Sequence, residues 1–118
     1  MATTELAAPA LPPLSARAEQ TVPGVLLSLA ARYGDRGYLH HWSQAGWRTV
    51  SWREFTERAL GVAAGLISAG VKPGERVAIL SENRLEWLIA DLAIQSAGGV
   101  TIPIYPTLTA ASVKHIVK

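Results

Sequence analysis

The stretch Arg76–Ile104 has the sequence RVAILSENRLEWLIADLAIQSAGGVTIPI. Its two ends, Arg76–Leu80 and Val100–Ile104, are short runs that are apolar on both faces, as buried parallel strands are. Between them, Leu85–Ala97 has the length of a helix, and a glycine pair closes it. A strand, a helix and a strand with short connections form a βαβ unit. We therefore expect two parallel strands joined by a right-handed crossover.

A helix and a hairpin are expected before this unit. Thr21 can cap a helix, and Gly34 can end it. Two runs of aromatic and β-branched residues follow on either side of a four-residue loop. They are Tyr38–Trp42 and Trp47–Ser51. The runs predict a β-hairpin in which the tryptophans beside the loop form a cross-strand pair. The apolar positions of the helix are Val22, Val25, Leu26, Leu29 and Tyr33.

The next helix has start and stop signals. The sequence SWRE from Ser51 to Glu54 matches the capping box. In this motif the serine and glutamate side chains each accept a hydrogen bond from a free backbone N–H at the start of the helix. Glu54 and Arg58 are four residues apart, in the better orientation for an ion pair. Gly70 is expected to end the helix before a turn at Lys72–Glu75. Its apolar face is predicted to consist of Phe55, Ala59, Val62 and Leu66.

The predicted elements indicate an α/β fold that this stretch of chain does not complete. The helix at Leu85–Ala97 is apolar nearly all round, which is typical of a helix buried on several sides in a larger protein. Two parallel strands alone also leave both sheet edges open. After Pro106 stops the second strand, Thr109 caps a helix from Ala110 that reaches Lys118 without a stop signal. We expect the first part of a larger α/β domain, truncated inside a helix.

The first 20 residues differ in composition from the rest. Residues 1–20 are rich in alanine and proline, and they predict a flexible tail without a secretory signal. Residues 21–118 then form the incomplete domain. The apolar stretch Leu85–Ile104 is interrupted by charged and polar residues, so we expect no transmembrane segment. A soluble, cytoplasmic protein is the expectation, which leaves a peripheral membrane contact open.

Composition excludes several classes of protein. The 118 residues include no cysteine, which rules out a disulfide scaffold, a thiolate zinc site and a cysteine nucleophile. Charged residues make up 17% of the chain, and the net charge of +2 is too small to indicate nucleic-acid binding.

One pair of motifs resembles a known family. The loop Ser81–Arg84 (SENR) together with Pro103–Thr107 (PIYPT) is similar to the N-terminal region of long-chain acyl-CoA synthetases. These enzymes belong to the adenylate-forming, or AMP-binding, superfamily. The run PGERVA from Pro73 to Ala78 is a pattern that the wider superfamily shares, and the resemblance covers about Val22 to Lys118.

The resemblance implies a reaction for a longer parent protein. In this family a fatty acid carboxylate attacks the α-phosphate of MgATP, which gives an acyl-adenylate and pyrophosphate, and the thiol of coenzyme A then displaces AMP. The resemblance thus implies ATP, Mg²⁺ and coenzyme A as cofactors and a long-chain fatty acid as substrate. The family's phosphate loop, its ribose-binding acid and its C-terminal lysine have no counterpart in these residues. We therefore assign no catalytic, cofactor-binding or metal-binding residue here, and we expect the 118 residues to be inactive without the remainder of the ligase.

The loop after the first parallel strand is the first candidate site. Ser81, Asn83 and Arg84 follow the carboxyl end of that strand, where α/β proteins often bind ligands. The loop has none of the glycines that a close phosphate approach needs. We therefore favour a structural role, in which Ser81 or Asn83 caps the helix and Arg84 pairs with a carboxylate or with a distant segment.

The other candidates are also given structural interpretations. His40 and His41 are neighbours on a strand and point to opposite faces, so they cannot bind one metal together, and His115 is isolated. The four tryptophans are expected to serve packing, because no basic cluster accompanies them. They are Trp42, Trp47, Trp52 and Trp87. The run Tyr105–Thr107 is expected to be the exit from a strand. Four carboxylates are candidates for paired acid and base catalysis, but the sequence gives no support for it. They are Glu54, Glu57, Glu82 and Glu86.

Two alternatives remain open. The chain could be a standalone, non-enzymatic α/β module that completes its sheet with a partner chain, since open strand edges recruit partners. The parent could also be an acyl-AMP ligase or an aryl-CoA ligase of the same superfamily.

Overall fold

The computed structural model describes residues 21–118, so the predicted tail at residues 1–20 lies outside the described part. The described residues contain four helices and four strands. They are α1 (Val22–Tyr33), β1 (Gly37–Ser43), β2 (Gly46–Ser51), α2 (Trp52–Ser68), β3 (Arg76–Leu80), α3 (Leu85–Ser96), β4 (Val100–Ile104) and α4 (Ala110–Val117).

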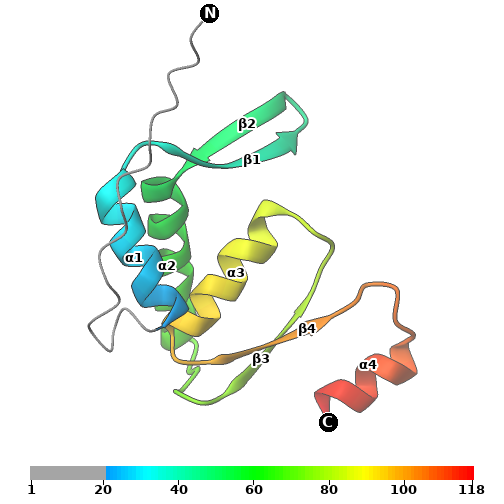
Figure 1. The fold of residues 1–118 in the computed structure, drawn as a ribbon. Coiled ribbons are helices and arrows are strands. Elements are labelled where there is room, and N and C mark those ends of the chain that lie inside the picture. Colours follow the sequence, from blue (N-terminus) through cyan, green and yellow to red (C-terminus); the bar gives the residue numbers. More distant parts are fainter. Residues whose placement is uncertain (1–20) are drawn as a thin grey trace, which may run out of the picture.

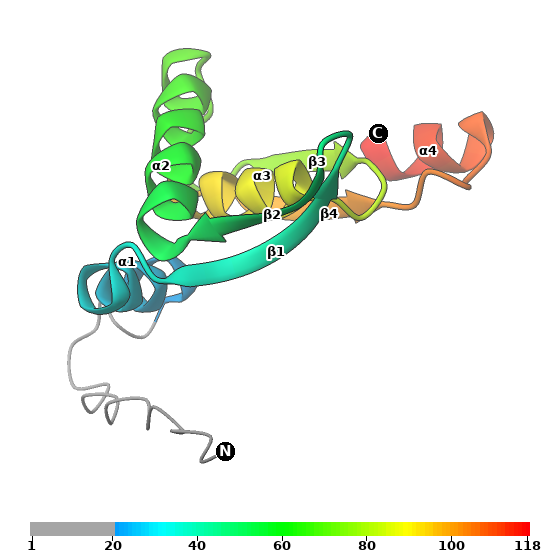
Figure 2. The ribbon, with the colours of Figure 1, turned by 90° about the horizontal axis from the view of Figure 1, so that it is seen from above.

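The elements form layers around α3. The antiparallel hairpin β1–β2 lies on one side of α3 and the parallel pair β3–β4 on the other, as Figures 1 and 2 show from two directions. Helices α1 and α2 pack against α3, while α4 lies beyond the far end of β4 and has no buried residue. The α/β fold with a hairpin, a helix and one βαβ unit is thus confirmed.

The βαβ unit has the predicted parallel strands. Arg76 pairs with Val100, and the register continues to Leu80 opposite Ile104. Helix α3 ends at a glycine with φ 82°, Gly98, after which the backbone N–H of Gly99 donates to the Ile94 carbonyl at 2.8 Å. This pairing of a left-handed glycine with a bond back into the helix is a standard helix stop.

The two parallel strands are covered on one face only within the described residues. Within the described residues only Ile79 and Ile104 of these strands are buried, whereas Leu80 and Val100 are exposed. The exposed face agrees with the expectation that this stretch of chain does not complete the α/β fold. The physical reason is that α3 covers one face of the pair, and the described residues supply no second layer.

Helix α1 and the hairpin lie close to the residues predicted from the sequence. The Thr21 hydroxyl accepts the backbone N–H of Gly24 at 3.1 Å, which confirms the cap, although Val22 of the predicted apolar face is exposed. The strands extend one residue further than predicted on each side, so that Ser43 pairs with Gly46 and the loop has two residues instead of four. The Ser43 hydroxyl donates to the Gly46 carbonyl at 2.9 Å, which holds this tighter turn.

Helix α2 has only half of the predicted capping box. The Ser51 hydroxyl accepts the backbone N–H of Glu54 at 3.1 Å, while the Glu54 carboxylate lies 4.0 Å from Arg58 in the predicted ion pair. The predicted apolar face is wrong at Val62, which is exposed, because the neighbouring Ala63 faces α3 instead. A small residue is needed there, since the two helices approach closely.

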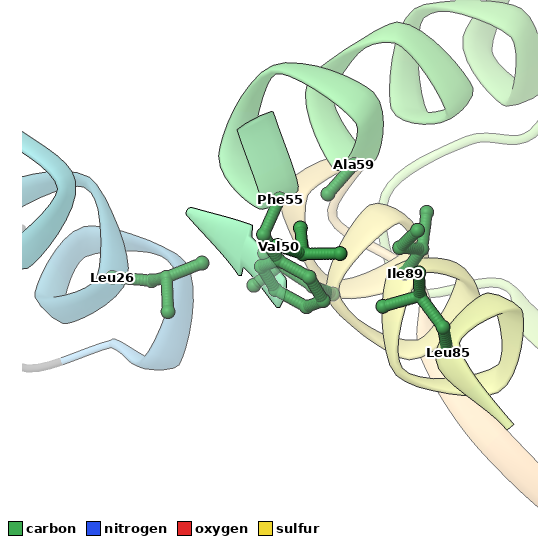
Figure 3. Packing of buried hydrophobic residues seen from close by; sticks show 7 residues of the cluster. Leu26, Val50, Phe55, Ala59, Leu85 and Ile89 are labelled. Atoms are coloured by element: carbon green, nitrogen blue, oxygen red, sulfur yellow. The ribbon is translucent and has the colours of Figure 1, made fainter. Parts of the chain in front are cut away.

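The main core joins α1, α2, α3 and β2. Phe55 lies at its centre, and side chains reach it from α1, from β2 and from the first half of α3 (Figure 3). Half-buried aromatic rings cover its outer side. The ring of Trp52 stacks on Tyr38 with centroids 3.9 Å apart, and the Phe55 ring meets Tyr38 edge-on at 5.1 Å. The buried residues of the cluster are Leu26, Val50, Phe55, Ala59, Leu85, Ile89 and Leu92.

Candidate functional site

A cleft lies between the hairpin and the start of α3. It has a volume of about 1000 Å³. One wall is the outer half of the hairpin, and the other is the loop after β3 with the first turn of α3 (Figure 1). The cleft thus brings Asn83 and Arg84 of the predicted candidate loop beside His40, His41, Trp42 and Trp47.

The predicted helix cap in this loop is wrong. Arg84, not Ser81 or Asn83, is the residue before α3, and its side chain makes no capping hydrogen bond. The Ser81 hydroxyl instead donates to the Glu82 carbonyl at 3.0 Å, and Asn83 is exposed. The chain passes through Arg84 in a fully extended conformation, which places both candidate caps too early to reach the free N–H groups.

Of the two partners expected for Arg84, a carboxylate or a distant segment, the structure shows a carboxylate close in sequence. The Arg84 Nε donates to the Glu86 carboxylate at 2.9 Å, across the first turn of α3. This hydrogen bond is the main cause that lowers the pKa of Glu86, and a backbone N–H of Glu86 itself adds to the effect. A carboxylate in the first turn of a helix is also favoured by the helix dipole.

We expect the pKa of Glu86 to rise when Arg84 is replaced by alanine. Because the pKa is lowered in the folded chain, the pair stabilises the fold above the unfolded-state pKa, and that contribution is lost as the pH falls through the folded pKa. Both side chains are well exposed, so the effect on the free energy of unfolding is small. An NMR titration of the carboxyl carbon measures it. Arg58→Ala is the matched control, since Arg58 is the smallest of the charges that lower this pKa; an equal rise in both variants would contradict the assignment to Arg84.

The histidines do not assemble a metal site. Nδ1 of His40 lies 2.8 Å from the Thr49 hydroxyl on the neighbouring strand, while His41 alternates to the other face. His115 lies on α4, far along the chain. Among residues 21–118 no three His, Cys, Asp or Glu side chains come close enough to bind a metal ion.

The tryptophans divide into two kinds. Trp52 packs on Tyr38 and Trp87 is half-buried, as predicted. Trp42 and Trp47 are 68% and 72% exposed, so the packing interpretation is wrong for this pair in the described chain. They do form the predicted cross-strand contact, edge-on with ring centroids 5.6 Å apart.

The remaining candidates keep their structural roles. Glu54 and Glu57 are exposed on α2, and β4 ends at Ile104, so that Tyr105–Thr107 is a strand exit. The Thr109 hydroxyl then accepts the backbone N–H of Ser112 at 3.3 Å and caps α4.

The cleft does not fit a nucleotide. Its loop offers Glu82 and Glu86 as anionic groups, and the guanidinium of Arg84 is already paired. A triphosphate needs several backbone N–H groups at close approach, which glycines allow and this loop lacks. The loop of this cleft therefore lacks the groups of a triphosphate site, and we derive no catalytic step from it.

The arrangement of hairpin, helices and βαβ unit is that of adenylate-forming enzymes. A fatty acid AMP ligase from Legionella pneumophila matches 83% of this chain with a TM-score of 0.76 and 26% identity, over 18% of its own length. The N-terminal subdomain of NpsA from Klebsiella oxytoca matches 81% with a TM-score of 0.73 and 27% identity, over 24% of its length. The chain belongs to the AMP-binding enzyme family, which matches residues 28–118.

Curated relatives agree with this assignment. A long-chain-fatty-acid–CoA ligase, FadD15 of Mycobacterium bovis, is 43% identical over 72 residues, which are 61% of this chain and 12% of the relative. A second relative comes from Mycobacterium tuberculosis and is named 3-[(3aS,4S,7aS)-7a-methyl-1,5-dioxo-octahydro-1H-inden-4-yl]propanoyl:CoA ligase. It is 36% identical over 97 residues, which are 82% of this chain and 18% of the relative. The chain thus spans less than a fifth of either relative.

Within residues 21–118, no helix combines the length and the apolar composition that a membrane crossing requires.

Proposed function

We propose that this chain is the N-terminal segment of an ATP-dependent ligase that activates long-chain fatty acids. In this reaction the fatty acid carboxylate displaces pyrophosphate from ATP to give acyl-AMP, and coenzyme A then displaces AMP to give the thioester. The observation that supports this most is the 43% identity with a long-chain-fatty-acid–CoA ligase. The adenylate-forming fold is consistent with the first half of the reaction.

The proposal gives these residues a structural role in the ligase. ATP, Mg²⁺ and coenzyme A would bind to parts of the parent outside this stretch, and the cleft described above offers no glycine-rich loop for a triphosphate. The exposed apolar side chains of β3 and β4 would be covered by the remainder of the same domain. A cytoplasmic location remains a prediction.

Purification of the native protein from its source tests the proposal. An antibody against the α2 peptide Arg53–Gly70 captures the protein, and its size and its activity with palmitate, ATP and coenzyme A are measured. We expect a product several times larger than 12.6 kDa that releases pyrophosphate and forms palmitoyl-CoA. The 118-residue chain should form neither product. Acyl-AMP without thioester would identify an acyl-AMP ligase, and turnover of benzoate alone would identify an aryl-CoA ligase; either result contradicts the present proposal.

A non-enzymatic module is the second candidate, and the open sheet favours it. Leu80 and Val100 are exposed on the two-stranded parallel pair, as a surface that pairs with another chain would be. A native product of about 12.6 kDa that elutes as a folded dimer or hetero-complex would support the module over the ligase.

A further inference from the structure

The outer edge of β4 is poorly suited to pairing with another strand. Within residues 21–118, neither outer edge of the parallel pair is paired. The Val100 N–H donates to the Glu75 carbonyl at 2.8 Å, where the pairing with β3 begins. Since successive residues of a strand turn their backbone groups to opposite sides, Thr101 and Pro103 direct theirs to the outer edge. Proline has no N–H, so this edge lacks a hydrogen-bond donor, and proline within a sheet is typical of an edge strand.

The outer edge of β3, in contrast, has a complete set of backbone groups. The residues of β3 that bond to β4 are those in phase with Glu75, so Arg76, Ala78 and Leu80 direct an N–H and a carbonyl outward. The register with β4 is regular along the whole strand. An open edge of this kind forms hydrogen bonds with an added strand. The sheet can therefore grow on the side of β3.

Helix α4 lies on the opposite face of the parallel pair from α3, as Figure 1 shows. A cleft of about 700 Å³ lies between the end of α4 and this face, and Ala78, Ile102, Ile116 and Val117 are among the residues that line it. α3 packs on the other face, where Ile79 is buried. Helix α4 thus runs back along the strands, from the end of β4 toward the start of β3.

The position of α4 selects the same edge as the proline. Crossovers between parallel strands are right-handed in about 98% of cases. The step from β3 to β4 uses α3 on one face, so a step of the same hand over the opposite face runs in the reverse direction across the sheet. A parallel strand that follows α4 therefore passes β4 and pairs with β3. The two observations are independent, because one concerns backbone donors and the other concerns the layer in which a helix lies.

We propose that the outer edge of β3 is the docking surface for a parallel, apolar β-strand from the remainder of the ligase. The source of this strand rests on the proposed function. This chain covers only 24% and 18% of two matched adenylate-forming structures, so most of such a protein lies outside these residues. A two-fold related copy of this chain would instead place its β3 antiparallel to the first.

The chemistry of the strand follows from its surroundings. A parallel strand between two helical layers is apolar on both faces. Its side chains would cover Leu80, which is 57% exposed, and extend into the cleft beside Ile116. With this strand in place β3 is a central strand, which accounts for its apolar sequence although part of it is exposed within the described residues.

Amide hydrogen exchange in the native parent tests the docking edge. The parent is captured with the antibody against the α2 peptide, exchanged in D₂O and analysed residue by residue by fragmentation in a mass spectrometer. We expect the Ala78 and Leu80 amides to exchange at least about hundredfold more slowly than in the 118-residue chain alone. The Thr101 amide on the other edge is the matched control, and its rate should change by less than about threefold.

The other outcomes of this measurement overturn the proposal. They are protection of Thr101 without Ala78, protection of neither amide, and equal protection of Ala78 in the 118-residue chain, which would come from a second copy. A native product of about 12.6 kDa in which another polypeptide protects β3 would favour the non-enzymatic module. Exchange is measured without substrate. A parent that activates a different acid would therefore contradict the proposed function and leave the docking edge unaffected.

Two proline variants of the parent give a second readout. Ala78→Pro and Thr101→Pro each remove an N–H that points to an outer edge of the pair. Ala78→Pro should reduce the yield of soluble, folded parent at least about tenfold, because the ring blocks the docked strand, whereas Thr101→Pro should leave it within about threefold. Both variants of the 118-residue chain should retain its helical circular dichroism, which separates a loss of docking from local misfolding. Equal losses in the two parent variants would contradict the assignment to β3.

Discussion

Replacing Phe55 by alanine is expected to remove a large part of the free energy of unfolding of this chain. Phe55 is only 3% exposed, and it joins the hairpin to all three packed helices through the main core. Its ring also supports Tyr38, which in turn stacks on Trp52. Truncation of a buried phenylalanine costs about 3–5 kcal/mol, and whole domains are stable by about 5–15 kcal/mol. Urea unfolding followed by tryptophan fluorescence measures the loss.

The matched control for this variant is Leu60→Ala. Leu60 lies on the same helix but is exposed, so its truncation should change the free energy of unfolding by about 0.5 kcal/mol or less. Equal losses in the two variants would show that the described core does not form around Phe55.

The local start and stop signals of the sequence predicted most of the element boundaries. Thr21, Ser51 and Thr109 all cap the helices they were expected to cap, because an N-cap depends on a side chain and a backbone N–H only three residues away. The parallel pairing and the Trp42–Trp47 pair were also predicted correctly. Each of these features is determined by residues that are near in sequence or joined by one short connection.

The errors have a common physical cause, which is packing between distant elements. Whether Val62 or Ala63 faces inward depends on how closely α3 approaches, and both positions suit the helical spacing. Packing between elements also buries Thr56, on which no prediction was made, and its hydroxyl has no hydrogen-bond partner among the described residues. In the cleft, the loop after β3 was predicted as a candidate site, but its proximity to the hairpin follows from the layering around α3 and could not be derived from spacing.

Replacing Ala93 by leucine is expected to push α2 and α3 apart. Ala93 is completely buried, and it packs with Ala63 of α2 and with Ala97, beside the half-buried Leu66. Three alanines at one crossing allow the backbones to approach, and a larger side chain there must displace a helix or adopt a strained rotamer. Such overpacking costs about 1–3 kcal/mol, with the upper end expected here because the contact is between backbones. Thermal unfolding measured by circular dichroism gives the size of the effect.

The adjacent turn of α3 offers a control that adds the same atoms in a different place. Ala90 lines an open groove of about 390 Å³ between α2 and α3, and it is only half-buried. Leucine at this position can extend into the groove over Val62, so Ala90→Leu should be neutral or slightly stabilising. A loss at Ala90 as large as that at Ala93 would mean that the helices are in contact along their whole length. The difference between the two variants therefore measures how sharply the small-residue contact is confined to one end of the α2–α3 pair.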